Sequence, residues 1–328
     1  MRNTIQAFDV GSGLAAAALL CLAQGFMSSG AHAANQGQSR METMQDICGQ
    51  CMPEKFVQCG NFLEGPAFDR DGNLWMVSIE NGNIQKVTPG GQCSTVTNTN
   101  GQPQGLKFHK DGRLFGVDRK RGVFWIDTKT GAVHDYVRYF ENENFHGPND
   151  LIFDRQGGIY FTDPWGTSPL NPRGDVYYIS PEPEKRIVRL ANNLAFPNGI
   201  ALSPDEKTLY INDFDNQRVL AVPIVAPGEL NVGFAHVFGG TLAGGWGPDG
   251  DAVDSKGNLY IAHYGAGEVV VIDPNGFMIG TIALPSSAGN QTTNLAFHGD
   301  YLYITEAGKN EVWRVKVNNP GGMLFANR

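Results

Sequence analysis

The chain has 328 residues, and its 33 Asp and Glu residues against 25 Lys and Arg residues give it a net charge of −8 at neutral pH. With 41% hydrophobic and 18% charged residues, it has the composition of a folded globular protein and not of a disordered acidic one. The acidic balance argues against nucleic acid as a partner, because phosphate binding needs a basic face. The 42 glycines and 18 prolines follow no collagen-like period and indicate many short strands joined by turns.

The first 33 residues have the features of an export signal. Arg2 precedes an apolar stretch over residues 14–27, and Ala31-His32-Ala33 forms a small-x-small cleavage site. The apolar stretch is short and interrupted for a membrane span. We therefore expect residues 1–33 to be a cleaved signal peptide, with an uncleaved anchor as the alternative. The mature protein is then periplasmic or secreted, without membrane attachment.

An N-terminal segment, residues 34–60, carries three of the four cysteines that remain after cleavage: Cys48, Cys51 and Cys59, with Cys93 following later. In an oxidising compartment four clustered cysteines predict two disulfides, for which three pairings are possible. The alternative is that Cys48-Gly-Gln-Cys51 is a redox pair or half a zinc site. No second pair with matching spacing follows, so we favour disulfides that tie this segment to the rest of the fold.

One sequence pattern occurs six times between residues 61 and 318: an apolar pair, a polar turn, then Leu or Ile followed by an aromatic residue. Each copy has the pattern of two short strands around a tight turn, and a further β-rich run follows it. The copies are AFDRDGNLWMVS (67–78), KFHKDGRLFGVD (107–118), IFDRQGGIYFTD (152–163), ALSPDEKTLYIND (201–213), AVDSKGNLYIAH (252–263) and AFHGDYLYITE (296–306).

The spacing of these copies predicts the fold. Their Leu or Ile anchors are 40, 45, 50, 50 and 43 residues apart, and about four strands in such a period is typical of a β-propeller blade. We predict an all-β, six-bladed β-propeller over residues 61–318, followed by a C-terminal tail, 319–328. A β-sandwich is the alternative, and six copies in register argue against it. We expect the strand-like Phe56-Val57-Gln58 to close the ring.

The innermost strand of every propeller blade lines the central channel, so equivalent positions form a ring. The position four residues before the first apolar anchor of each copy always carries a side-chain oxygen. These positions, which we call the ring residues, are Glu64, Gln104, Asn149, Asn198, Asp249 and Thr293.

Converging buried oxygens without partners are costly, and a hard cation would satisfy them. Glu64 and Asp249 carry two negative charges, and Asn149 and Asn198 add neutral amide oxygens. This set predicts a Ca²⁺ site at the channel centre, because calcium takes six to eight oxygen ligands. Zinc normally requires His or Cys, and magnesium keeps more of its water. A water-filled polar channel is the alternative.

Further polar residues are expected around this centre. The second strand of each copy ends in a mostly polar circle that either orients ligands or caps loops: Ser78, Asp118, Asp163, Asp213, His263 and Glu306. Asp251 is an acid where the other copies are apolar, and it is either a buried acid near the centre or merely hydrogen-bonded. Of the isolated histidines His146, His263 and His298, we expect His146, three residues before Asn149, to enter the channel mouth. The basic turn Arg119-Lys120-Arg121 is expected to be solvated.

Four phrases, EGPAFDRDGNLW, PNDLIFDRQGGIYFTDP, FPNGIALSPDEKTLYINDF and GPDGDAVDSKGNLYIA, resemble the senescence-marker-protein/gluconolactonase/luciferin-regenerating family over about residues 61–318. The resemblance implies a six-bladed calcium-binding propeller, in many members a lactonase. It implies metal ligation by Glu64, Asn149, Asn198 and Asp249. Sugar-lactone members often have an Arg two residues before the Asn of blade three. This chain has Gly147 there, which argues against a gluconolactone-type substrate.

We therefore predict a calcium-dependent hydrolase that opens a lactone, with a small-molecule lactone or ester as its substrate. Asp249, or a metal-bound water, is the expected base. Gln104, His146, Asp213, Asp251 and His263 are the expected supporting or substrate-contacting residues. One alternative is hydrolysis of phosphotriesters or aryl esters at the same ion. The other is a binding propeller whose calcium is only structural.

Overall fold

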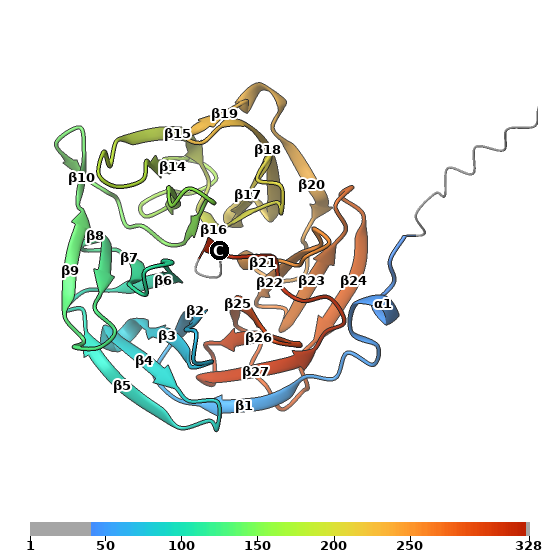
Figure 1. Ribbon diagram of the computed structural model, residues 1–328. Coiled ribbons are helices and arrows are strands. Elements are labelled where there is room, and N and C mark those ends of the chain that lie inside the picture. Colours follow the sequence, from blue (N-terminus) through green and yellow to red (C-terminus); the bar gives the residue numbers. More distant parts are fainter. Residues whose placement is uncertain (1–40, 326–328) are drawn as a thin grey trace, which may run out of the picture. The chain divides into compact units, whose positions relative to one another are not determined.

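The computed structural model describes residues 41–325, and these residues form six antiparallel β-sheets around a central axis (Figure 1). Each sheet holds one of the six sequence copies, which confirms the predicted six-bladed β-propeller. The predicted signal peptide, residues 1–33, lies outside the described residues. We number the blades in chain order and call the end of the axis where the inner strands begin the ring face.

The first three blades each have four strands in chain order, from the axis outward, and a two-stranded hairpin follows blade 2. Blade 1 consists of β2 (Leu63–Phe68), β3 (Leu74–Ser78), β4 (Asn83–Val87) and β5 (Cys93–Asn98). Blade 2 consists of β6 (Pro103–Phe108), β7 (Leu114–Asp118), β8 (Gly122–Ile126) and β9 (Val133–Val137), and the hairpin is β10 (Tyr139–Phe140) and β11 (Glu143–Asn144). Blade 3 consists of β12 (Leu151–Phe153), β13 (Ile159–Asp163), β14 (Gly174–Ile179) and β15 (Ile187–Leu194).

The remaining blades keep this order, with an additional short strand in blade 4. Blade 4 consists of β16 (Pro197–Leu202), β17 (Thr208–Asp213), β18 (Arg218–Ala226), β19 (Glu229–Leu230) and β20 (His236–Thr241). Blade 5 consists of β21 (Gly247–Val253), β22 (Leu259–Tyr264), β23 (Glu268–Ile272) and β24 (Met278–Ala283). Blade 6 consists of β25 (Thr292–His298), β26 (Tyr301–Glu306), β27 (Glu311–Lys316) and β1 (Glu54–Gln58).

The ring is closed by β1, which comes from the start of the chain and completes the last blade. Lys55 lies opposite Trp313 and Val57 opposite Val312 in an antiparallel pairing of β1 with β27. Figure 1 shows this as a blue strand beside a red one. The prediction that Phe56-Val57-Gln58 forms the closing strand is confirmed.

Helical structure is sparse in the described part of the chain. It consists of α1 (Met44–Cys48) and three 3₁₀ turns: η1 (Ile79–Asn81), η2 (Phe214–Asn216) and η3 (Val232–Phe234). None of the helices in residues 41–325 is long and apolar enough to pass through a lipid bilayer.

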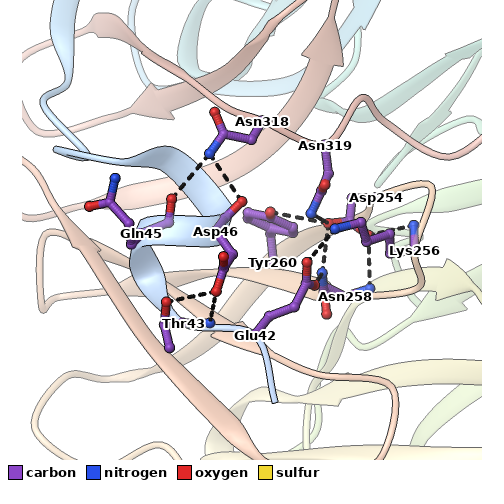
Figure 2. Close-up of polar contacts among 10 residues, drawn as sticks. All are labelled: Glu42, Thr43, Gln45, Asp46, Asp254, Lys256, Asn258, Tyr260, Asn318 and Asn319. Carbon is purple, nitrogen blue, oxygen red and sulfur yellow. Dashed lines mark hydrogen bonds and ion pairs between the residues drawn. The ribbon is translucent and has the colours of Figure 1, made fainter. Parts of the chain in front are cut away.

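The segment before β1 is attached to blade 5 by polar contacts (Figure 2). Glu42 pairs with Lys256 and accepts a hydrogen bond of 2.7 Å from the Asn258 amide. The Asn318 amide donates to the main-chain carbonyls of Gln45 and Asp46, at 3.2 and 3.1 Å. These contacts hold α1 on the ring and thereby position β1 for pairing.

In the polar turns between first and second strands, an aspartate side chain accepts the hydrogen bonds that hold the turn. Asp69 accepts hydrogen bonds from the Asn73 main-chain N–H, at 2.8 Å, and from the Trp75 indole, at 2.9 Å. Asp254 accepts equivalent bonds from the Asn258 N–H and the Tyr260 hydroxyl, at 3.0 and 3.2 Å. Asp side chains favour such turns, and here the same carboxylate also satisfies a buried aromatic donor.

The hydrophobic core is divided into six clusters, one between each pair of neighbouring blades. Trp75 of blade 1 packs with Phe124 of blade 2, for example, and Tyr160 of blade 3 packs with Leu209 of blade 4. The strands are therefore buried on both faces, which accounts for their near-continuous apolar sequences. Burial of this area holds the blades together and leaves the axis free for polar side chains.

The four described cysteines form two disulfides, Cys48–Cys51 and Cys59–Cys93. The first joins the end of α1 to the residues that follow it, so the expectation that the disulfides tie residues 34–60 to the rest of the fold is wrong for this one. The second joins the residue after β1 to β5, the outer strand of blade 1. It therefore links the closing strand of blade 6 to the blade next to it.

The C-terminal residues cross the axis on the face opposite the ring face. The carbonyl of Pro320 accepts a hydrogen bond from the Ser255 N–H, and the Gly322 N–H donates to the carbonyl of Val253, both at 2.8 Å. Phe325 is buried, with its ring centroid 4.7 Å from that of His109 and 5.4 Å from that of Phe153. This segment thus runs from blade 5 to blades 2 and 3.

Removing the Cys59–Cys93 disulfide by a double Cys→Ser substitution should lower the free energy of unfolding by about 4 kcal/mol, because it closes a long loop. The matched control is the double substitution at Cys48 and Cys51, which should cost only about half as much, because their loop is short. Their sequence separations are 34 and 3 residues. Denaturant unfolding of the oxidised proteins measures both values, and equal losses would contradict the role assigned to Cys59–Cys93.

Candidate active site

All six ring residues are buried on the ring face, five of them within the inner strands and Asn149 two residues before β12. The charge of Glu64 acts on Asp249, and the amide of Asn198 donates a hydrogen bond to the Asp249 carboxylate. Side chains from blades 1, 4 and 5 therefore meet on the axis. Thr293 differs, because its hydroxyl is used in hydrogen bonds to the Leu63 carbonyl, at 2.7 Å, and to the Thr305 hydroxyl, at 2.8 Å.

A β-bulge at the same point of the inner strands directs these side chains. The register between first and second strands shifts at or just after the ring residue in five blades: between Glu64 and Ala67, Pro103 and Leu106, Pro197 and Ile200, Pro248 and Asp251, and Thr292 and Leu295. In blade 3, the ladder of β12 begins only at Leu151. A bulge places an extra residue in one strand and turns its side chains out of the ladder.

The main chain of three ring residues is held by the preceding blade. The carbonyl of Asn149 accepts a hydrogen bond of 2.8 Å from the Gly105 N–H. The carbonyl of Asn198 accepts one of 2.7 Å from the Thr162 hydroxyl. The carbonyl of Asp249 accepts one of 2.6 Å from the Asn212 amide. Each bond links neighbouring blades, so blade packing determines where the ring residues project.

The residues directly after the ring residues form a second layer that sequence reasoning missed. Four of the six are glycines: Gly65, Gly105, Gly199 and Gly250. The other two are Asp150 and Asn294. A Cβ at Gly105 would lie 2.5 Å from the Asp150 carboxylate, and a Cβ at Gly250 would lie 2.1 Å from the Asn294 amide carbon. The glycines thus make room for these two side chains.

Asn294 connects the two layers. Its amide donates to the carboxylate of Glu64, at 2.9 Å, and reaches that of Asp150, at 3.4 Å. An alignment of the six copies at this one position, which reads Gly, Gly, Asp, Gly, Gly, Asn, contains the signal that would have found both residues. Asp150 and Asn294 therefore belong to the candidate site.

Burial and mutual repulsion raise the pKa of the acids on the axis. Burial, then the charge of Asp150, raises the pKa of Glu64 to about 8. Burial, then the charge of Glu64, raises the pKa of Asp249 well above its usual range. Burial also raises the pKa of Asp150 and that of Asp251. Several acids with shifted pKa values gathered at one point are typical of a functional site.

Two cations face these four acids. The Lys107 ammonium lies 3.9 Å from the Asp150 carboxylate, and its side chain is largely buried. Arg119 is half-buried, and burial lowers its pKa while the charges of Glu64 and Asp249 raise it. The Arg119 guanidinium also donates to the Gln104 side-chain oxygen, at 3.3 Å. The prediction that the whole turn 119–121 is solvated is therefore wrong for Arg119, which points toward the acids.

The circle at the ends of the second strands is buried and caps loops on the ring face. Asp213 accepts hydrogen bonds from the Ala195 N–H, at 2.9 Å, and from the Arg218 guanidinium, at 2.8 Å. Asp163 accepts from the main-chain N–H groups of His146 and Gly147, at 2.9 and 2.6 Å. These bonds hold the loops that lead into the ring residues of blades 3 and 4.

The other expected supporting residues occupy different surroundings. The His146 side chain is exposed and lines a shallow depression that also includes Asp175 and Arg189. His263 is buried, with Nδ1 3.2 Å from Glu268 Oε1 and with Nε2 lacking a hydrogen-bond partner among the described residues. Asp251 lies below the ring, where the bulge interrupts simple alternation. Neither of its oxygens has a well-formed hydrogen bond in the described structure.

A cavity of about 490 Å³ lies at the other end of the axis. Its walls come from the later residues of the inner strands, such as Phe108 and Phe297, and from the C-terminal segment, including Phe325. Lys107 and Asp251 line it, but none of the ring residues does. The ring residues are therefore separated from this cavity and belong to the ring face.

The chemistry of the ring residues fits a hard cation. The side-chain oxygen of Asn198 is buried without a hydrogen-bond partner among residues 41–325, while its amide nitrogen bonds Asp249. Two carboxylates and amide oxygens are suitable calcium ligands. In the described part of the chain, no three His, Cys, Asp or Glu side chains form a metal-binding group by themselves. Any ion here would therefore depend on the amides as well.

Sequence comparison identifies the family to which this six-bladed propeller belongs. Residues 62–308 match the family described as the SMP-30/gluconolactonase/LRE-like region, and the chain belongs to that family. It is similar to the lactonase drp35 of Staphylococcus aureus, with 36% identity over 231 residues, which cover 68% of this chain and 70% of that protein. Relatives with this name indicate a hydrolase that acts on a small molecule.

Solved structures show the same fold. A gluconolactonase from Xanthomonas campestris superimposes with a TM-score of 0.73 at 24% identity, covering 84% of this chain and 92% of that one. The calcium-binding protein regucalcin from Agrobacterium tumefaciens superimposes with a TM-score of 0.67 at 24% identity, covering 82% and 99% of the two chains.

The raised pKa of Glu64 predicts how the stability of the metal-free protein depends on pH. The folded state keeps this proton up to a pH of about 8, whereas the unfolded chain loses it near 4.5. Folded protein thus binds more protons in this window, so the free energy of unfolding should fall as the pH rises through it. Glu64→Gln should flatten that slope, and Glu80→Gln, at an exposed glutamate near the ring face, should not. Melting temperatures in chelator from pH 5 to pH 8 test this. An unchanged slope in Glu64→Gln would contradict the assignment.

Proposed function

We propose that this protein hydrolyses a lactone, that is, a cyclic ester, at the ring face and depends on Ca²⁺. Family membership and the relatives named lactonases support the reaction class. The observation that carries the proposal is the meeting of Glu64, Asn198 and Asp249 on the axis, with the unpartnered oxygen of Asn198 among them. Asn149, buried at the equivalent position of blade 3, is the fourth proposed ligand.

The charges on the axis favour a divalent ion. When Glu64, Asp150, Asp249 and Asp251 are ionised, Lys107 and Arg119 offset two of the four negative charges. Two negative charges then remain, which one divalent cation balances. Calcium is the ion we propose, because the ligand oxygens are all carboxylate or amide and the ring contains no His or Cys.

In the proposed reaction, the bound ion would polarise the lactone carbonyl and stabilise negative charge on its oxygen. Glu64, Asn149, Asn198 and Asp249 would hold the ion, and Asp249 would also accept the proton of the attacking water. Water oxygen bonds to the carbonyl carbon, the ring C–O bond breaks, and the proton passes to the leaving oxygen. The product is a hydroxy acid, and all atoms of lactone and water are accounted for.

The surroundings of Asp249 suit the role of a general base. Burial and the neighbouring Glu64 raise its pKa well above the usual range in the metal-free protein, and a bound cation would keep the carboxylate ionised, as a proton acceptor must be. The Asn198 amide hydrogen-bonds the side chain of Asp249, and the Asn212 amide hydrogen-bonds its main-chain carbonyl. These two bonds fix the orientation of Asp249. Arg119, on the same side of the axis, can balance charge that develops near the site.

Asp249→Asn should lower kcat/KM for lactones by at least about 10²-fold, because it removes the proton acceptor and one charge from the ion site. The matched control, Asp215→Asn, removes a half-buried acid of the neighbouring turn η2 and should retain activity. A pH-stat assay over several lactones, with calcium and with chelator, gives both results. Full activity of Asp249→Asn, or full activity in chelator, would contradict the mechanism. A stable wild type that hydrolyses no lactone would support a binding propeller instead.

We also propose that the mature protein is exported to the periplasm or secreted. The Ala31-His32-Ala33 site and the two disulfides of residues 41–325 support an oxidising destination. Mass spectrometry of the protein from expressing cells should find a chain that begins at residue 34. A full-length chain in the cytoplasm would exclude export.

A further inference from the structure

Five aromatic side chains form a continuous series on the ring face, which we call the aromatic arc: Trp165, Phe196, Phe214, Tyr264 and Trp246. Neighbouring ring centroids are 6.0 Å apart for Trp165 and Phe196, 5.8 Å for Phe196 and Phe214, 6.1 Å for Phe214 and Tyr264, and 5.6 Å for Tyr264 and Trp246. These separations are within the range of interacting aromatic pairs. The arc spans blades 3 to 5.

The arc lies beside the proposed ion site. Phe196 comes two residues before Asn198, and Trp246 comes three before Asp249. At one end, the Arg119 guanidinium lies 3.7 Å from the ring centroid of Trp165. The negative charges of Glu64 and Asp249 also act on Arg119 and raise its pKa against the effect of burial. Near the other end, the charge of Asp249 adds to burial in raising the pKa of Tyr264.

The arc is not a consequence of the blade repeat. Phe214 and Tyr264 each follow a residue of the polar circle, and Trp165 lies two residues after Asp163. The residues that directly follow the circle in blades 6, 1 and 2 are not aromatic: Ala307, Ile79 and Arg119. At this position only blades 4 and 5, which carry Asn198 and Asp249, have aromatic residues.

The exposure of the two tryptophans at the ends of the arc is costly unless something binds there. Trp246 is 67% exposed and Trp165 is 45% exposed, although large aromatic side chains gain free energy by burial.

We propose that the aromatic arc binds an aryl group of the substrate, so that the preferred substrates are uncharged lactones with an aryl substituent or a fused aromatic ring. This inference rests on the proposed lactone hydrolysis and adds its substrate class. The aryl group stacks against Trp246, Tyr264 and Phe214, and the carbonyl carbon then faces Asp249. Arg119 is held flat on Trp165 and closes the other end of the arc.

A polyhydroxylated lactone fits this wall poorly. Its hydroxyl groups need hydrogen-bond partners once water is displaced. Within the arc, Tyr264 and the two tryptophans provide a single polar group each, and the phenylalanines provide none. An aryl group instead gains from burial and from stacking. We therefore expect kcat/KM to favour an aryl lactone over the matching unsubstituted lactone by about tenfold or more.

The test compares γ-phenyl-γ-butyrolactone with γ-butyrolactone and with glucono-δ-lactone in a pH-stat assay of the calcium-loaded protein. Trp246→Ala should reduce the preference for the phenyl lactone by about tenfold. The control, Phe277→Ala, removes an exposed aromatic residue just before β24 and should leave the preference unchanged. A binding readout independent of turnover is quenching of tryptophan fluorescence by 5-phenylpyrrolidin-2-one, a lactam that the reaction leaves intact.

Each outcome decides one of the two proposals. An aryl preference that Trp246→Ala reduces supports the arc. Hydrolysis without aryl preference, or a preference that Trp246→Ala leaves intact, overturns the arc and retains the lactonase. If no lactone is hydrolysed, the proposed function fails. The fluorescence measurement with the lactam then decides whether the arc binds an aryl group. An aryl site is supported if the lactam quenches the fluorescence and Trp246→Ala weakens that quenching by more than the loss of one fluorophore explains. If the lactam causes no quenching, the aryl site is overturned.

Discussion

Repulsion among four buried carboxylates is the constraint around which the centre of this protein is organised. Glu64, Asp150, Asp249 and Asp251 come from three different blades and are removed from water together. Their ionisation has to be balanced, and Lys107 and Arg119 balance only part of it. A divalent ion at the ring residues completes the balance in our account. Binding of that ion would then displace protons from the acids and add to the stability of the fold.

The blades supply the precision that such a site requires. Their hydrophobic clusters lie between blades, so the axis itself carries no core. Bulges turn the ring residues inward, and glycines such as Gly105 and Gly250 leave space for Asp150 and Asn294. Hydrogen bonds from Thr162 and Asn212 then join Asn198 and Asp249, respectively, to the blade before each of them. Rigid elements that support one another across blades place reacting groups more accurately than loops can.

Much of this arrangement could be predicted from the sequence, because the repeat relates equivalent positions. The six copies led to the propeller, the closing strand and the ring residues. Asp150 and Asn294 were missed because strict alternation was assumed, and the bulge adds a residue that alternation does not allow for. Arg119 was misjudged because the path of a loop side chain is a tertiary property. The crossing of the axis by Phe325 has no repeat to reveal it, and the pairing of the cysteines also depended on the fold.

The most direct measurement is a crystal structure of the protein grown with saturating calcium, with anomalous scattering to identify the ion. Our account predicts one ion on the axis, at about 2.3–2.6 Å from oxygens of Glu64, Asn149, Asn198 and Asp249. An axis without an ion at these residues, or calcium held elsewhere by Asp150 and Asp251 alone, would contradict it.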